Sequence, residues 1–273
     1  MLFKLIFHDM LADSRRRFIL LAISLVSAIA SIGAGVGSVA ARANGNEQLS
    51  LSLELIPYLA TLLSGVVLII LYISIYKGFH RALYSTEGQL AFTRPVSRSA
   101  VLLSKTIADS IWVSVFSLLN LGINTVMITT SSASGTLIKE LVGESLLPVI
   151  AENTALYVPL LLAYGIISSV SGLLIAELAI TFGALIPRNH KLICGIGIFF
   201  GARSVVSVLA ETVSTVLTLP LYELRDGGMA LPESALPTHS LTVILVTLIV
   251  DVGVIVGAYL ISRLIVNKKL SFR

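Results

Sequence analysis

Four ionisable side chains lie inside long apolar segments, where a charge is costly. They are Arg203, Asp251, Glu177 and Asp109. Arg203 and Asp251 each stand about ten residues into an apolar run, which at ~1.5 Å per helical residue places both near the centre of a bilayer. An isolated charge there costs at least ~2.5–3.5 kcal/mol on insertion scales, and a pair facing the interior of a helix bundle offsets much of that cost.

Two roles fit the Arg203–Asp251 pair. It could bind substrate or line a water-filled path, or it could act as a structural latch between two helices. The latch is favoured because buried charges pair readily. Glu177, in the inner half of its segment, competes for Arg203. Asp109 needs less explanation, because Lys105 lies four residues earlier and so faces it on the same helix.

Catalytic and metal chemistry have no support in the sequence. There is no His-Glu-x-x-His and no Gly-x-Ser-x-Gly, and the four histidines are scattered along the chain. The single cysteine, Cys194, lies in an apolar run and is predicted to be a packing residue. We therefore predict no catalytic residues, no metal site and no enzymatic activity in this chain.

Composition sets the broad class. Hydrophobic residues make up 56% of the 273 residues, charged residues only 12%, and the mean hydropathy is +0.95. Soluble domains carry roughly a quarter charged residues. The sequence predicts an all-α membrane protein that forms a single transmembrane domain over residues 1–273. Six apolar runs have membrane-spanning length, at approximately residues 18–40, 56–75, 106–128, 156–182, 192–209 and 241–264.

Segments around these runs carry further expectations. Residues 2–14 are predicted to form a helix in the membrane interface, because their apolar side chains share one face. Residues 213–222 are apolar enough to form a re-entrant or interfacial element. Trp112 is placed within reach of the inner interface. Close helix packing is predicted in spans one, five and six at the pairs Gly33/Gly37, Gly197/Gly201 and Gly253/Gly257.

The distribution of basic residues predicts the orientation. Fifteen of the 19 Lys and Arg residues fall on the side of the two termini, whereas only Arg42, Lys139 and Arg225 fall on the opposite side. Lys and Arg near span ends remain on the cytoplasmic side. Both termini are therefore predicted to be cytoplasmic. The net charge of +4 is modest, and its distribution favours membrane orientation over nucleic-acid binding.

The segment 77–105 between spans two and three is the longest basic loop. It carries five Lys and Arg residues against one acid, Glu87. Apolar side chains are mixed into two short helix-sized pieces, and Pro95 disfavours helix at Arg94 between them. A tether would not need so much apolar surface in water, so this loop is predicted to dock onto another surface.

The same loop carries a family resemblance. Residues 87–98, EGQLAFTRPVSR, followed by LLSK at 102–105, resemble the first cytoplasmic loop of ABC-2-type permeases. These are membrane subunits of one class of bacterial ATP-binding-cassette exporters. The similarity lies in an acid–Gly pair, then Leu, then Pro-Val-Ser-Arg, then a Lys that opens the third span. The predicted topology is similar over the whole chain.

The resemblance implies that residues 84–90 form the coupling helix that seats in a groove of the ATPase subunit. The coupling residues would then be Tyr84, Glu87, Gly88, Leu90 and Arg94. A plainer interpretation of Glu87, as an acid that balances neighbouring arginines, stands beside this one.

The resemblance also implies partners. The chain has no Gly-x-x-x-x-Gly-Lys-[Ser/Thr], so ATP and Mg²⁺ would be bound by a separate ATPase subunit. Six spans would supply half of a transport pathway, in a homodimer or with a related permease, in the bacterial plasma membrane. The expected cargo is hydrophobic or amphipathic, such as a peptide, lipid or drug. The alternatives are a membrane-anchoring or immunity subunit that transports nothing, and a secondary transporter.

Overall fold

The computed structural model describes residues 2–12, 14–84, 97–130, 154–183, 191–225, 228–230 and 235–269. Within them a short helix, α1, precedes six helices that are long and apolar enough to cross a membrane. The bounds are α1 Leu2–Ala12, α2 Ser14–Ala43, α3 Glu47–Tyr84, α5 Arg98–Thr130, α8 Thr154–Gly183, α9 Lys191–Thr218 and α10 Leu236–Lys269. The protein is a multi-pass helical membrane protein, and the predicted all-α fold with six spans is confirmed.

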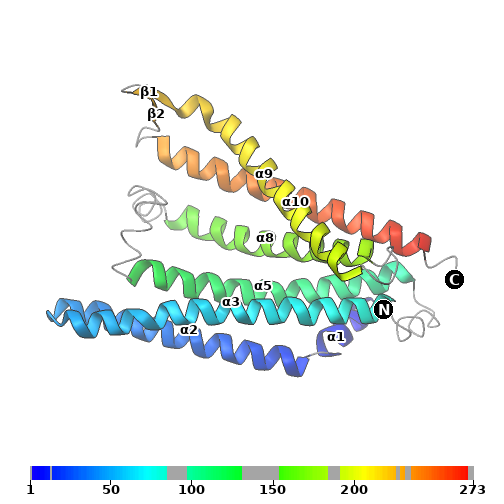
Figure 1. The fold of residues 1–273 in the computed structure, drawn as a ribbon, viewed down its shortest axis with the longest axis horizontal. Coiled ribbons are helices and arrows are strands. Elements are labelled where there is room, and N and C mark those ends of the chain that lie inside the picture. The colour runs from blue at the N-terminus through cyan, green and yellow to red at the C-terminus, as the bar shows by residue number, and fades with distance from the viewer. Residues whose placement is uncertain are drawn as a thin grey trace.

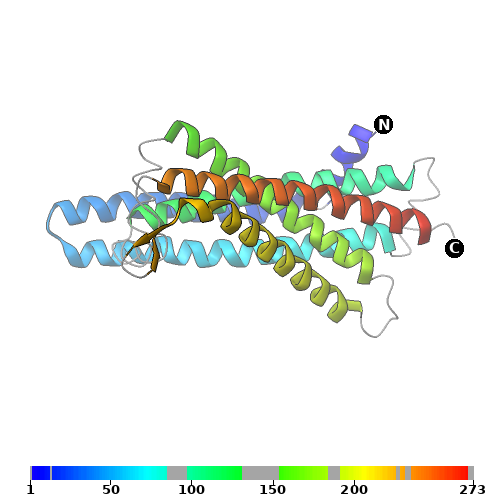
Figure 2. The same ribbon diagram turned by 90° about the horizontal axis from the view of Figure 1, so that it is seen from above.

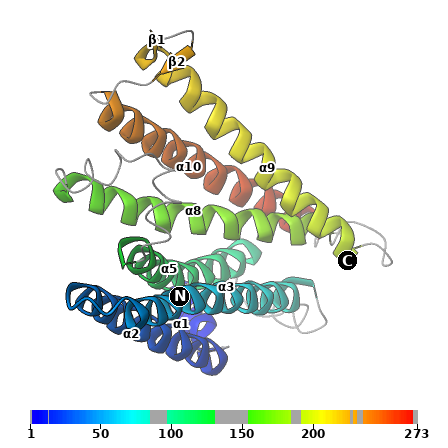
Figure 3. The same cartoon turned by 60° about the vertical axis from the view of Figure 1, so that its left-hand side comes forward.

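The six long helices form two groups. Helices α2, α3 and α5 pack together, helices α8, α9 and α10 pack together, and α5 against α8 makes the main contact between the groups (Figures 1 and 3). Helix α9 crosses the others obliquely (Figure 2). Helix α1 and the last turn of α10 lie at the same end of the bundle, which we call the N/C end (Figure 1). Segments on both sides of the basic loop, the end of α3 and the start of α5, also reach this end.

At the opposite end of the bundle, a tight turn joins α2 to α3. Gly45 has φ +74°, a left-handed conformation that glycine adopts without a Cβ penalty. The backbone N–H of Gly45 donates to Arg42 O at 3.0 Å, and that of Asn46 to Ala41 O at 3.0 Å, which ends α2 in a Schellman motif. The Asn46 side chain then accepts from Leu49 N at 3.2 Å and caps the start of α3.

Helix α2 packs on its neighbours through small residues. Its buried face carries Ser24, Ser27, Ser31, Gly35 and Ser38, which allow close approach of backbones. The predicted glycine pairs contribute little to this packing. A Cβ on Gly37 would meet Leu53 Cδ1 at 3.2 Å. On Gly33 and on the glycines predicted for spans five and six, a Cβ would meet no atom of the described residues within 4 Å apart from its own helix's nearby backbone and chain neighbours.

The apolar core joins α2, α3, α5 and α8 around Trp112 of α5. The Trp112 ring packs edge-on against Phe18, with centroids 5.3 Å apart, and also contacts Phe116. Trp112 is only 7% exposed, so its ring packs inside the bundle rather than on the outer surface. Its place within reach of the inner interface stays a prediction. The other members of this core are Leu20, Val67, Leu71, Ile75, Val113 and Leu173. Apolar side chains also dominate the outer faces of α2, α3, α9 and α10, as a lipid-facing surface requires.

Helix α9 is longer than the sequence indicates. It continues to Thr218, so the predicted end of span five near 209 and a separate re-entrant element from 213 are wrong. Residues 210–218 contain neither Gly nor Pro, and the helix stops just before Leu219, where Pro220 disfavours further α-helix. A 3₁₀ turn, Leu219–Leu221, follows. The short strands β1 (Glu223–Arg225) and β2 (Gly228–Ala230) then pair antiparallel.

The basic loop is shorter than predicted. Residues 77–84 continue α3, and α5 already begins at Arg98, because Ser97 caps it by accepting from Ala100 N at 3.3 Å. Tyr84 is the last residue of α3, while Glu87, Gly88, Leu90 and Arg94 lie outside the described residues, as does most of the predicted coupling helix.

Helix α1 ends at Ala12, two residues earlier than predicted. It exposes Phe3, Phe7 and Leu11 along one side, whereas Leu5 and Ile6 are partly buried. The exposed apolar side suits the membrane interface, and the other side packs on α5.

Candidate functional site

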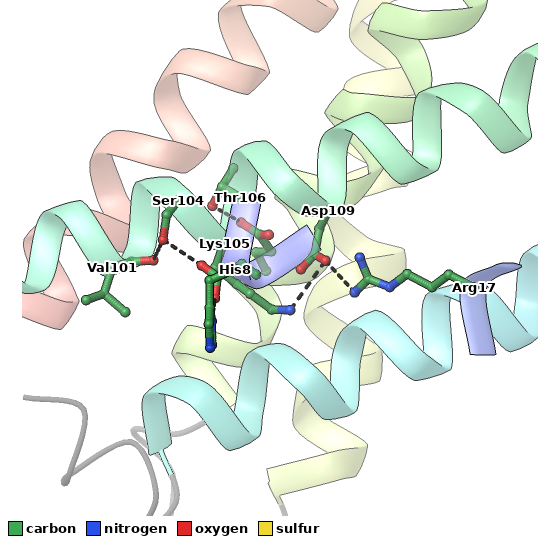
Figure 4. Close-up of polar contacts among 9 residues, drawn as sticks. His8, Arg17, Val101, Ser104, Lys105, Thr106 and Asp109 are labelled. Carbon is green, nitrogen blue, oxygen red and sulfur yellow. Dashed lines mark hydrogen bonds and ion pairs between the residues drawn. The ribbon is translucent and has the colours of Figure 1, made fainter. Parts of the chain in front are cut away.

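A cluster of buried charges lies near the N/C end, where α1, α2, α5 and α8 meet. Its centre is an ion pair in which Arg17 Nη2 of α2 donates to Asp109 Oδ1 of α5 at 2.7 Å (Figure 4). Both side chains are fully buried. Lys105 Nζ lies 3.5 Å from the same carboxylate oxygen, which agrees with the pairing predicted from the four-residue spacing. Two cations therefore share one acid.

Arg17 is buried because of its position on α2. It lies on the side of the helix that continues three and seven residues later with Leu20 and Ser24, which face the protein interior. Arg15 and Arg16 point elsewhere and are exposed. The Arg17 guanidinium carbon also lies 5.7 Å from the centre of the Trp112 ring, within range of a cation–π interaction. The sequence suggested only that Arg17 flanks the first span.

Helix α1 is held against α5 in the same region. Ser104 Oγ donates to Asp9 Oδ2 at 2.7 Å, and His8 Nδ1 lies 3.7 Å from the other oxygen of Asp9. Ser104 and Lys105 belong to the second turn of α5, so the contact to α1 sits directly beside the contact to α2 (Figure 4). Sequence analysis did not predict this contact, since Asp9 and Ser104 carry no pattern that links them.

Glu177 brings α8 into the cluster. Thr106 Oγ1 donates to Glu177 Oε2 at 2.7 Å, and both side chains are buried. The predicted competition of Glu177 for Arg203 is therefore wrong, because the carboxylate faces α5 rather than α9. Three consecutive residues of α5, from Ser104 to Thr106, thus contact groups on α1, α5 and α8.

A second polar site lies midway along the bundle, between α8, α9 and α10. Arg203 Nη1 lies 3.8 Å from Asp251 Oδ1, and Arg203 Nη2 donates to Ser168 Oγ at 3.4 Å. The structure thus brings together the two residues that the sequence analysis paired. The pair is loose, however, since 3.8 Å exceeds hydrogen-bond distance. Asp251 is buried, whereas 42% of the Arg203 side chain is exposed.

Hydroxyl groups link the two helix groups near this level. Ser117 of α5 and Ser169 of α8 have their Oγ atoms 2.5 Å apart, and Ser117 Oγ also donates to Gly165 O at 3.2 Å. Tyr72 of α3 donates to Ser169 O at 3.4 Å. These contacts join α3 and α5 to α8.

The buried cluster links α1, α2, α5 and α8 through side-chain hydrogen bonds and ion pairs. The described residues contain no group of three side chains suited to a metal ion. Comparisons with protein-family models, with curated proteins and with solved structures gave no match for this chain. Its assignment as a multi-pass helical membrane protein rests on the six long apolar helices.

The first prediction concerns the Arg17–Asp109 pair. We expect Arg17→Ala to lower the stability of the detergent-solubilised protein by ~3–5 kcal/mol, because the substitution leaves a buried carboxylate without its closest partner. A thermal melt measures the loss. The control is Arg16→Ala, which removes an exposed arginine one residue away and should leave the melting temperature nearly unchanged. Equal melting temperatures for the two variants would contradict the assigned role of Arg17.

The second prediction concerns the mid-membrane pair. We expect Arg203→Ala to cost less stability than Arg17→Ala, because Arg203 is half-exposed and lies 3.8 Å from its acid. The exchange Arg203→Asp with Asp251→Arg should recover part of the loss caused by either single alanine variant, because the opposite charges remain adjacent. Thermal melts of the wild type, Arg203→Ala, Asp251→Ala and the exchanged double variant test this. A double variant as damaged as the two singles combined would show that no pairwise stabilisation exists.

Proposed function

We propose that this chain is the permease subunit of an ATP-binding-cassette exporter of the bacterial plasma membrane. In this proposal it forms half of the translocation pathway and couples to a separate ATPase subunit through the loop between α3 and α5. The observation that carries the proposal is the contact pattern of Ser104, Lys105 and Thr106. These residues lie at the end of the sequence that resembles the ABC-2 coupling region. Ser104 contacts α1 and Thr106 contacts α8, while Lys105 contacts Asp109, the acid that binds Arg17 of α2.

The orientation supports this proposal. Lys4, Arg15, Arg16 and Arg81 lie in helix segments at the N/C end, where the loop between α3 and α5 also attaches. A surplus of Lys and Arg beside the spans marks a cytoplasmic side. A cytoplasmic ATPase would then meet the loop directly.

The buried cluster provides a path for mechanical coupling. A force on the loop acts first on the start of α5, where Ser97 and Arg98 open the helix. Since Asp109 contacts Arg17 and Thr106 contacts Glu177, a shift of α5 along its axis must move α2 and α8 with it or break hydrogen bonds in a dry environment. The cost of breaking them favours movement as a unit.

The proposal includes two further partners. ATP and Mg²⁺ belong to the ATPase subunit, and a second permease, identical or related, supplies the other half of the pathway. A hydrophobic or amphipathic cargo suits the apolar surfaces of α3 and α9.

The third prediction tests the ATPase partnership. The purified chain should hydrolyse no ATP, and a tagged copy extracted gently from its native membrane should bring down an ATP-binding-cassette subunit. Phosphate release measures the first and mass spectrometry the second. ATPase activity in this polypeptide alone would contradict the permease proposal. Stimulation of the complex by a transported compound separates an exporter from an anchoring or immunity subunit.

The fourth prediction concerns the loop. We expect Glu87→Arg to weaken ATPase association or uncouple transport, because it reverses the charge near the centre of the proposed coupling helix. Glu211→Arg is the control, since Glu211 is an exposed acid in the half of α9 away from the N/C end. Both variants should insert and melt like the wild type. If Glu87→Arg left both association and transport intact, Glu87 would be an ordinary surface acid.

A further inference from the structure

Arg203 differs from the buried charges Arg17, Asp109 and Glu177 because its side chain reaches the surface in the middle of a span. It lies 12 residues from the first residue of α9 and 15 from the last. At ~1.5 Å per residue, neither helix end is closer than about 18 Å along the axis. A guanidinium that is 42% exposed at this depth meets hydrocarbon unless another group covers it.

The guanidinium has unused hydrogen-bonding capacity. It carries five N–H donors in a planar fork. Within the part of the chain that the structure describes, its one hydrogen bond is the long contact to Ser168 Oγ at 3.4 Å, and Asp251 lies beyond hydrogen-bond distance at 3.8 Å. An oxyanion with two oxygens, such as a carboxylate or phosphate, matches that fork with two parallel hydrogen bonds.

The positions of the two charges favour an anion over a cation. Asp251 is 2% exposed and lies on the protein side of Arg203, so a ligand arriving from outside meets the guanidinium first. Asp251 and Ser168 then serve to position the Arg203 side chain from α10 and α8. A cationic ligand would have to displace Arg203 to reach the acid.

The approach to Arg203 is apolar. Ile196 and Phe200, seven and three residues earlier on the same side of α9, are 50% and 63% exposed. On the neighbouring surface of α10, Val252 and Val256 are also about half exposed. A small hydrophilic anion gains nothing from such a surface, whereas a molecule with a hydrocarbon tail buries apolar area against it.

We propose that Arg203 binds the carboxylate or phosphate head group of an amphipathic anion whose hydrocarbon tail lies along α9. The inference deepens the proposed function and rests on it, because it names the class of cargo that the pathway takes. Asp251 and Ser168 are positioning residues in this site.

The test uses the full chain in phosphatidylcholine nanodiscs without any ATPase. Two photoactivatable probes are compared, a diazirine-bearing palmitic acid and the matched palmityl alcohol. We expect the acid to label the α9 peptide around Arg203 with at least about tenfold higher apparent affinity than the alcohol, as charge-assisted hydrogen bonds imply. Arg203→Gln should reduce acid binding to the level of the alcohol, and Arg203→Lys should retain part of it.

The control variant is Arg263→Gln, which removes an exposed arginine from α10 near the N/C end and should leave labelling at α9 unchanged. Equal labelling by acid and alcohol in the wild type overturns the inference, whether or not Arg203→Gln folds. Acid labelling confined to other helices, or equal effects of the two glutamine variants, also overturns it.

A further arm identifies the source of the anion. If phosphatidylglycerol added to the nanodiscs competes with labelling by the palmitic acid probe, the site binds an anionic bilayer lipid. If labelling by the palmitic acid probe persists, the site binds a single-chain anion. Both results support the anion site. Failure of this assay leaves recruitment of an ATPase untouched. Conversely, if the acid binds in this assay but no ATPase subunit co-purifies with the chain from its native membrane, the anion site stands and the exporter proposal fails.

Discussion

The arrangement of helices at the N/C end depends on one constraint, which is that a charge in a dry environment must meet its counter-charge inside the protein. Arg17 and Asp109 satisfy it for each other at 2.7 Å, with both side chains fully buried. Their contact fixes the rotation of α2 and of α5 about their own axes, because turning either helix would expose the two charges or separate them. The small serine-rich face of α2 lets the two backbones approach closely enough for the contact to form.

Helix α5 is the hub of this end because about one and a half turns of it contact three other helices, α1, α2 and α8. Ser104 contacts Asp9, Lys105 contacts Asp109, Thr106 contacts Glu177, and Asp109 contacts Arg17. The residues just before them begin the helix after the basic loop. In the proposed function, a subunit that pulls on this loop would act on a region where four helices are connected.

Arg17 and Arg203 show that arginines inside the spans can have different structural roles. Arg17 is enclosed, bonded at short range and stacked near Trp112, so it stabilises the packing of α2 on α5. Arg203 is half-exposed and loosely paired, with donors to spare. In the proposed function, the connected N/C end would transmit force and the mid-membrane arginine would meet cargo.

Local features of the sequence were sufficient for the fold class and the number of spans. Six long apolar runs predict six spans because hydropathy and length belong to each segment by itself, and the contact between Lys105 and Asp109 follows from a four-residue spacing on one helix. The pairing of Arg203 with Asp251 was also within reach, since each is a charge at similar depth in its span.

The tertiary structure alone decided which charges meet across helices. Arg15, Arg16 and Arg17 are equivalent in sequence, and only the rotation of α2 against α5 selects the third for burial. Glu177 bonds Thr106, 71 residues away, rather than Arg203, because the crossing of α8 turns it toward α5. Apolarity is a property of a segment and can be summed along the chain, whereas a cross-helix contact depends on the rotation, depth and crossing of two helices, which packing determines.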